Sequence, residues 1–184
     1  MDFTGTVLIA SPYMEDPNFR MTVTLIVHQQ GDAITGLVLN RPTSATVADI
    51  WREQFHREYP SEEPVYLGGP VSSPPMALLL KTFPMSDSDQ AMFSVELSVD
   101  EEQIAGALSD KGQFCRVFVG CAGWTEPQLR GEIDQGAWYL LRAEEIDIFQ
   151  EPKEMWISSL QKSTLAGFQR VFHLKRLPSN PEDN

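Results

Sequence analysis

The 184-residue chain has little of what metal sites, disulfide frameworks and nucleic-acid grips require. It contains two cysteines, Cys115 and Cys121, too few for a disulfide framework or a four-cysteine zinc site. Its three histidines, His28, His56 and His173, lie in separate segments, so no metal site is expected. No run approaches the roughly 18 consecutive apolar residues of a membrane span. Basic residues are also few: 14 Lys and Arg against 26 Asp and Glu give a net charge of −12. That charge argues against a domain that grips phosphate backbones.

What is present fits an ordinary folded domain. Apolar residues make up 42% of the chain and charged residues 22%, which is typical of a soluble protein. Met1 to Ser11 lack the basic region and the long apolar core of a secretory signal. We therefore expect a cytoplasmic protein with one domain over residues 1–177 and a loose tail over 178–184. We expect no membrane association and no cofactor.

The apolar pattern interleaves strands with short helices. A Gly-containing connection between residues 21–28 and 33–40 predicts an antiparallel hairpin, and Asn40-Arg41-Pro42 ends its second strand. The class predicted is α+β in a single domain, with a mixed or mostly antiparallel sheet and flanking short helices. Strands are expected at 6–10, 65–67, 76–83, 92–97, 114–120 and 137–141, and helices at 46–57, 98–109, 125–136 and from Pro152, with a last strand or turn at 171–174.

Single motifs carry little chemistry here. Gly68-Gly69-Pro70 lacks the third glycine and the following helix of a dinucleotide fingerprint, which favours a tight turn. No Gly-x-Ser-x-Gly occurs. Cys121 ends an apolar strand just before a helix start, where a packed, inert thiol is the commoner outcome. A hydrolase-like enzyme that uses Cys121, or a carboxylate with His28, stays open as an alternative.

The sequence shows no motif for direct binding of nucleic acid. Residues 86–110 carry acidic side chains and no base. The modest basic cluster of Lys162, Arg170, Lys175 and Arg176 fits a solvated surface. No helix-turn-helix with a basic second helix is visible.

Several segments, in order, resemble the bacterial YqgE/AlgH family from Gly5 to about Leu160. Three departures stand out: Cys121 replaces a usual Tyr, Pro127 and Arg130 depart from the pattern after Trp124, and Asp32 is an insertion. The resemblance rests on Leu8-Ile-Ala10 with Pro12 and Met14, Asp16-Pro17-x-Phe19, Thr24-Leu-Ile26, Gly36-Leu-Val-Leu-Asn-Arg-Pro42, Tyr66-x-Gly-Gly-Pro-Val71, Gly120-x-Ala-Gly-Trp124 with Gln128-Leu129 and Glu132, and Met155-Trp156.

The resemblance implies an α+β fold whose bent sheet curls into a barrel-like core. It also carries a label of transcriptional regulator, taken from alginate control in one lineage, but it implies no reaction. Polar and special residues at strand ends form our candidate ligand-binding surface, because sites are usually built at strand ends and loops. That surface comprises Asp16, Asn40, Arg41, Gly68, Gly69, Trp124, Gln128 and Glu132.

The sequence favours a non-enzymatic binding or regulatory module that acts through a protein or small-molecule partner. Arg41 is expected to pair with Asp16 or Glu132, or to recognise an anion with its planar fork. Trp124 is expected to supply an apolar wall. The alternatives are direct action on DNA, a hydrolase-like enzyme, and motifs that fix turns without forming a site. The sequence does not specify an oligomeric state.

Overall fold

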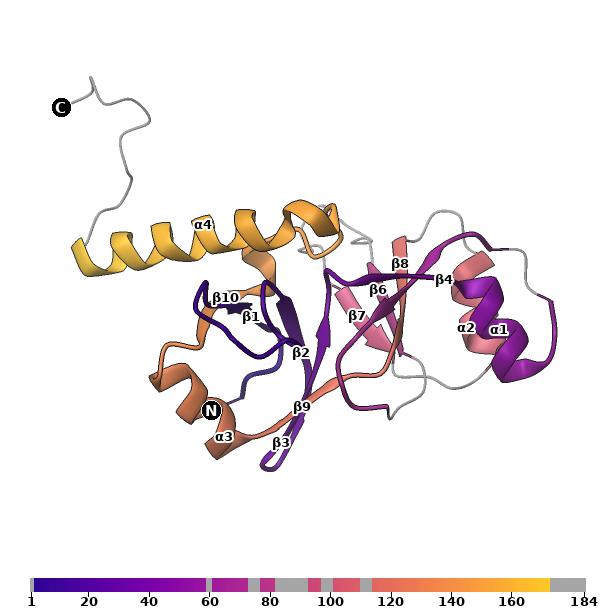
Figure 1. The fold of residues 1–184 in the computed structure, drawn as a ribbon, viewed down its shortest axis with the longest axis horizontal. Coiled ribbons are helices and arrows are strands. Elements are labelled where there is room, and N and C mark those ends of the chain that lie inside the picture. Colours follow the sequence, from indigo (N-terminus) through magenta and orange to yellow (C-terminus); the bar gives the residue numbers. More distant parts are fainter. Residues whose placement is uncertain are drawn as a thin grey trace, which may run out of the picture.

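The computed structural model describes residues 2–58, 61–72, 77–81, 93–96, 101–109 and 114–172. Figure 1 shows α1 and α2 together at one end of the molecule and α3 toward the other. The elements are β1 (Thr6–Ala10), β2 (Val23–Gln30), β3 (Ala33–Val38), β4 (Pro42–Thr46), α1 (Val47–Phe55), β5 (Pro64–Leu67), β6 (Ala77–Lys81), β7 (Phe93–Glu96), α2 (Glu101–Ser109), β8 (Phe114–Val119), β9 (Ala122–Thr125), α3 (Glu126–Asp134), β10 (Trp138–Arg142), the 3-10 helix η1 (Ala143–Glu145) and α4 (Pro152–Phe172).

The described strands form two five-stranded sheets. Sheet A has the order β10-β1-β2-β3-β9 and sheet B the order β4-β5-β8-β6-β7. All the pairs are antiparallel except β5 with β8. The predicted α+β class and the predicted hairpin of β2 and β3 are therefore confirmed. The barrel-like core is a correction, since both sheets keep open edges instead of closing on themselves.

Two further predictions need correction. The strand predicted to continue to Asn40 ends at Val38, and a second strand, β4, begins at Pro42. Val171 and Phe172 are the end of α4 and not a strand, because the helix runs on without a proline to stop it. The rest of that predicted segment, the first residues of the helix predicted at 98–109 and the tail at 178–184 lie outside the described residues.

Sheet A is buried on both faces because its side chains alternate between two cores. In β1, Leu8 and Ala10 face a core closed by Leu129 of α3. Val7 and Ile9 point the other way, into a core closed by Met155 of α4. Figure 1 shows α4 lying along β1 and β10, with its far end projecting past them. The double burial explains why β1 is a continuous apolar run.

Sheet B is covered by α1 and α2. Trp51 of α1 and Ile104 of α2 are buried against Val65 and Val117, which belong to the parallel pair β5 and β8. Trp51 also packs against Phe55 one turn later, with ring centroids 4.6 Å apart and ring planes tilted by 52°. The chain passes from sheet A to sheet B after β3 and returns after β8, so these two crossings connect the halves of the fold.

Candidate functional site

A cleft lies where the chain crosses between the two sheets. It has a volume of about 420 Å³, within the range of small-molecule sites. Arg41 comes from the outgoing crossing and Gly120 from the returning one. The residues that line the cleft are Asn18, Val38, Arg41, Ile50, Gln54, Leu67, Gly69, Pro70, Ser72, Val119 and Gly120.

Among the described residues that line the cleft, Arg41 is the one with a charge. Its Nη2 donates to the carbonyl oxygens of Pro17, at 2.9 Å, and Arg20, at 3.3 Å. Burial lowers the pKa of Arg41, and the nearby charge of Asp16 partly offsets this. An arginine starts from so high a pKa that it remains charged. The cleft therefore contains a fixed positive charge.

Glycines allow the backbones behind the cleft to approach closely. A Cβ on Gly69 would lie 2.3 Å from the carbonyl carbon of Cys121, and Gly69 has φ of +153°. A Cβ on Gly68 would lie 2.3 Å from the carbonyl oxygen of Gly120. Val71 and Cys121 then exchange two backbone hydrogen bonds of 2.9 and 2.8 Å. These close backbone contacts explain why residues 68 and 69 are glycines. The sequence predicted a tight turn here but not the close approach of residues 120 and 121.

A second group of predicted residues gathers around one carboxylate. Glu132 of α3 accepts hydrogen bonds from the indoles of Trp124, at 3.1 Å, and Trp138, at 2.8 Å. Its other oxygen accepts from Gln128 Nε2 at 2.9 Å. We call Trp124, Gln128, Glu132 and Trp138 the indole cluster. It fixes α3 onto β9 and β10.

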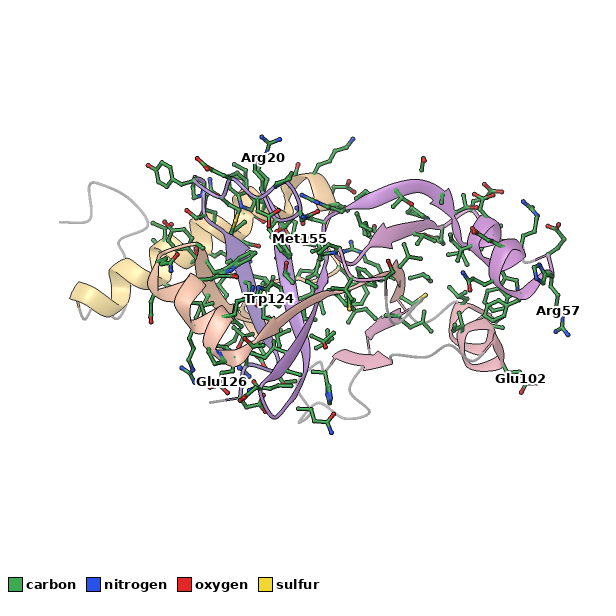
Figure 2. All side chains as sticks on the ribbon, turned by 60° about the horizontal axis from the view of Figure 1, so that its bottom comes forward. Arg20, Arg57, Glu102, Trp124, Glu126 and Met155 are labelled. Carbon is green, nitrogen blue, oxygen red and sulfur yellow. The ribbon has the colours of Figure 1, made fainter. Side chains whose placement is uncertain are left out.

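The loop between β1 and β2 connects this cluster to the cleft. Phe19 lies with its ring centroid 5.5 Å from those of both Trp124 and Trp138. Its neighbour Asn18 lines the cleft, and Pro17 accepts a hydrogen bond from Arg41. Figure 2 shows Trp124 of β9 inside the molecule, whereas Arg20 of the β1–β2 loop points outward. The β1–β2 loop therefore contacts the indole cluster through Phe19 and the cleft through Pro17 and Asn18.

The eight predicted site residues separate accordingly. Arg41 and Gly69 line the cleft, and Gly68 supports it. Asn40 instead completes the sheet beyond β3: its Oδ1 accepts from Val23 N–H and its Nδ2 donates to the Met21 carbonyl. Trp124, Gln128 and Glu132 belong to the indole cluster.

Asp16 holds a turn, since its Oδ1 accepts from Asn18 N–H at 2.8 Å. Within the described chain, the carboxylates of Asp16 and Glu132 form no ion pair with Arg41, so both pairings predicted for this arginine are wrong. Trp124 does supply an apolar wall, but to Phe19 rather than to the cleft.

Sequence reasoning missed most of the cleft. In the described part of the cleft, Asn18, Gln54 and Ser72 are the other polar side chains, and none of them stands out in a sequence without its spatial neighbours. It also missed Arg116, a buried arginine in β8 whose guanidinium donates to the carbonyls of Ile148, Phe149 and Gln150. A charged side chain inside the apolar run of 114–119 was the available signal.

The thiols show no activation. Burial raises the pKa of Cys115 and of Cys121, whereas a nucleophilic cysteine needs a lowered one. Strand β3 lies between the strand of His28 and the segment of Cys121. Across the described ranges, three or more potential metal ligands nowhere gather into a group. In the same ranges, every helix falls short of the length and apolarity that crossing a bilayer demands.

Known proteins of similar sequence and structure identify the family. A UPF0301 protein of Thermobifida fusca is 34% identical over 184 residues, covering 88% of this chain and 87% of that protein, and one of Streptomyces coelicolor is 33% identical over 86% of each. The solution structure of the AlgH protein from Pseudomonas aeruginosa has a TM-score of 0.69 at 25% identity, covering 97% of this chain and 96% of that one. The crystal structure of protein DIP2367 from Corynebacterium diphtheriae has a TM-score of 0.57 at 27% identity, covering 76% and 75%. A family model described as AlgH-like matches residues 7–166. The chain therefore belongs to the AlgH-like family, as its ordered motifs indicated.

Proposed function

We propose that this protein is a non-enzymatic binding module that takes a small ligand in the cleft at the sheet crossings. The observation that carries the proposal is the cleft itself, with a fixed guanidinium among apolar side chains that remain partly exposed. Leu67, for example, keeps 40% of its surface exposed while lining the cleft. Ligand sites combine such apolar walls with a few placed polar groups. The proposal includes a cytoplasmic location, for which it rests on the sequence alone.

A regulatory role would follow from where the cleft lies. Its walls come from both sheets, so a ligand that fills it contacts segments whose relative position defines the fold. A ligand stabilises the state that it binds in proportion to its occupancy. The transcription-related label of the family would then reflect signalling through a ligand or partner. Direct action on DNA stays the alternative, and affinity for duplex DNA that falls with added salt would favour it.

The test blocks the cleft without removing Arg41. Leu67→Trp places a large side chain in the cleft, and Ile157→Trp makes the same kind of change at an exposed site on α4, where Ile157 is 51% exposed. Both variants and the native protein are purified without denaturation from the same cytoplasmic extract, and bound small molecules are identified by mass spectrometry. We expect the native protein and Ile157→Trp to retain a compound that Leu67→Trp loses. Equal retention by all three, or none by any, contradicts the proposal.

A further inference from the structure

We infer that the ligand of the cleft is a small organic anion, a carboxylate or a phosphate ester with an apolar body. This inference rests on the proposed function and names the class of compound that the same site takes. The charge of the cleft differs in sign from the net charge of the protein. The protein carries a net charge of −12, yet the described side chains that line the cleft include one cation and no carboxylate. A positive site on an acidic molecule selects for anions locally and against cations.

The guanidinium of Arg41 has donors left for such a ligand. Nη2 is used by the carbonyls of Pro17 and Arg20. Within the described part of the chain, these are the hydrogen bonds that the guanidinium makes, which leaves Nε and Nη1. Arginine presents five N–H donors in a rigid plane that matches the oxygens of a carboxylate or phosphate. Both edges of a guanidinium that hold two oxygens of one anion include Nη2, so the free Nε and Nη1 donors offer an anion single charged hydrogen bonds.

Asp16 does not use the free Nε and Nη1 donors. The negative charge of Asp16 raises the pKa of Arg41, so the two side chains interact electrostatically. The positive charge of Arg20 lowers the same pKa. The Asp16 carboxylate instead accepts the Asn18 N–H and closes its own turn. Within the described residues it makes no ion pair with the guanidinium. The neighbouring acid thus leaves the donors of Arg41 available.

The arginine is held in place before a ligand arrives. Both of its carbonyl acceptors belong to the β1–β2 loop, and Phe19 of that loop packs against both Trp124 and Trp138. Each indole is fixed in turn by Glu132. A side chain fixed beforehand loses less conformational entropy on binding. The indole cluster is therefore a positioning device for the charged group of the cleft.

The volume of the cleft and its apolar lining favour an anion that carries an organic, apolar group. A volume of about 420 Å³ is many times the ~30 Å³ share of one water molecule, so an inorganic ion alone would leave the cleft largely wet. Apolar side chains that keep exposed surface at the cleft come from three elements or their ends: Ile50, Leu67 and Val119. Burying such surface is favourable only for a ligand with apolar atoms.

Four probe compounds of one shape test this class: benzoate, phenyl phosphate, neutral benzamide and cationic benzylamine. Each is titrated into the nitrogen-15-labelled full chain while the amide signals of Gly69 and Gly120 are followed by NMR. We expect benzoate or phenyl phosphate to shift both signals, and which of the two binds more tightly distinguishes carboxylate from phosphate. Benzamide is expected to bind at least about tenfold more weakly, because it lacks the charged hydrogen bonds to Arg41.

Variants of Arg41 and Arg142 test whether Arg41 is the residue that binds the anion. Arg41→Gln is expected to lose about tenfold or more in affinity for the better anion, and Arg41→Lys, which keeps the charge without the fork, to lose part of it. Arg142→Gln removes the same charge from β10, outside the cleft, where the side chain is 55% exposed, and is expected to bind as the native protein does. The Lys variant also covers the case in which Arg41→Gln fails to fold.

The outcomes separate the two claims. If benzamide or benzylamine shifts the cleft amides as strongly as the anions do, the anion class is overturned while the cleft remains a ligand site. If Arg41→Gln and Arg142→Gln bind equally, Arg41 is not the recognition group and the inference also fails. If none of the four compounds shifts Gly69 and Gly120 at millimolar concentration, the proposed function falls with it.

Discussion

Arg116 shows how one side chain can hold distant segments together. It is only 8% exposed, and its Nη1 and Nη2 donate to the carbonyls of Leu39, Ile148, Phe149 and Gln150 at 2.7–3.3 Å. The guanidinium also lies 4.8 Å from the ring centroid of Tyr66. Burial lowers the pKa of Arg116, while Tyr66 and the charges of Asp147 and Glu151 oppose that effect. Carbonyl dipoles and an aromatic face thus take the place of a direct carboxylate partner.

We expect Arg116→Met to lower the free energy of unfolding by about 3 kcal/mol, because carbonyls of the segment before α4 lose a charged donor. Methionine keeps much of the length and apolar bulk, so packing changes least. Urea unfolding followed by circular dichroism measures the difference. Arg142→Met, at an exposed site, should stay within about 0.5 kcal/mol of the native value. Equal effects of the two substitutions would mean that the carbonyl contacts of Arg116 contribute little.

At the scale of the element, α1 begins at a complete capping box. Thr46 Oγ1 accepts from the Asp49 N–H at 3.2 Å, and the Thr46 N–H donates to Asp49 Oδ2 at 2.9 Å. The hydroxyl of Thr46 also donates to the same carboxylate oxygen at 2.8 Å. These hydrogen bonds hold the pKa of Asp49 below its usual range. The box matters to the site because α1 supplies Ile50 and Gln54 to the cleft.

The box predicts a pH dependence of α1. A carboxyl whose native pKa is lowered stabilises the fold above its unfolded pKa, near 3.8, and loses that contribution as the pH falls through the native value. An NMR titration should therefore find Asp49 below 3.8, and Thr46→Ala should raise it while costing about 1 kcal/mol of stability. Thr125→Ala, at the cap of α3, is the matched control: it should leave the Asp49 titration unchanged. An Asp49 pKa that Thr46→Ala does not move would contradict the prediction.

Elements with strong local signals were predictable and the others were not. The start of α1 at Thr46 and the cap of α3 at Thr125 follow from residues next to one another in sequence. Strands β4 and β9 were missed, since PTSAT is polar and AGWT contains a glycine, and both are strands because of partners far along the chain. The cleft shares this difficulty: Arg41 and Gly69 were predicted, but its apolar walls come together only through tertiary packing.

For the whole molecule, the decisive feature is how the two sheets are joined. Gly68 donates its N–H to the Val119 carbonyl in sheet B at 2.9 Å and accepts from the Val38 N–H in sheet A at 2.8 Å. Its missing side chain leaves room for the Gly120 carbonyl on the returning crossing. The resemblance suggested one bent sheet curled into a barrel. Two sheets that meet at a glycine contact give the same class of fold and place a cleft at the contact.

The contact at Gly68 between the two sheets is expected to affect the stability of the whole protein. Gly68→Ala would set a Cβ 2.3 Å from the carbonyl oxygen of Gly120, a backbone atom that cannot swing aside. We expect the sheets to separate slightly and the free energy of unfolding to fall by about 2 kcal/mol or more. Gly131→Ala is the matched control, because nothing lies within 4 Å of its Cβ position in α3. That substitution should raise stability by up to about 1 kcal/mol through helix propensity. Urea unfolding measures both, and a Gly68→Ala protein as stable as the native one would show that the glycine contact does not hold the sheets together.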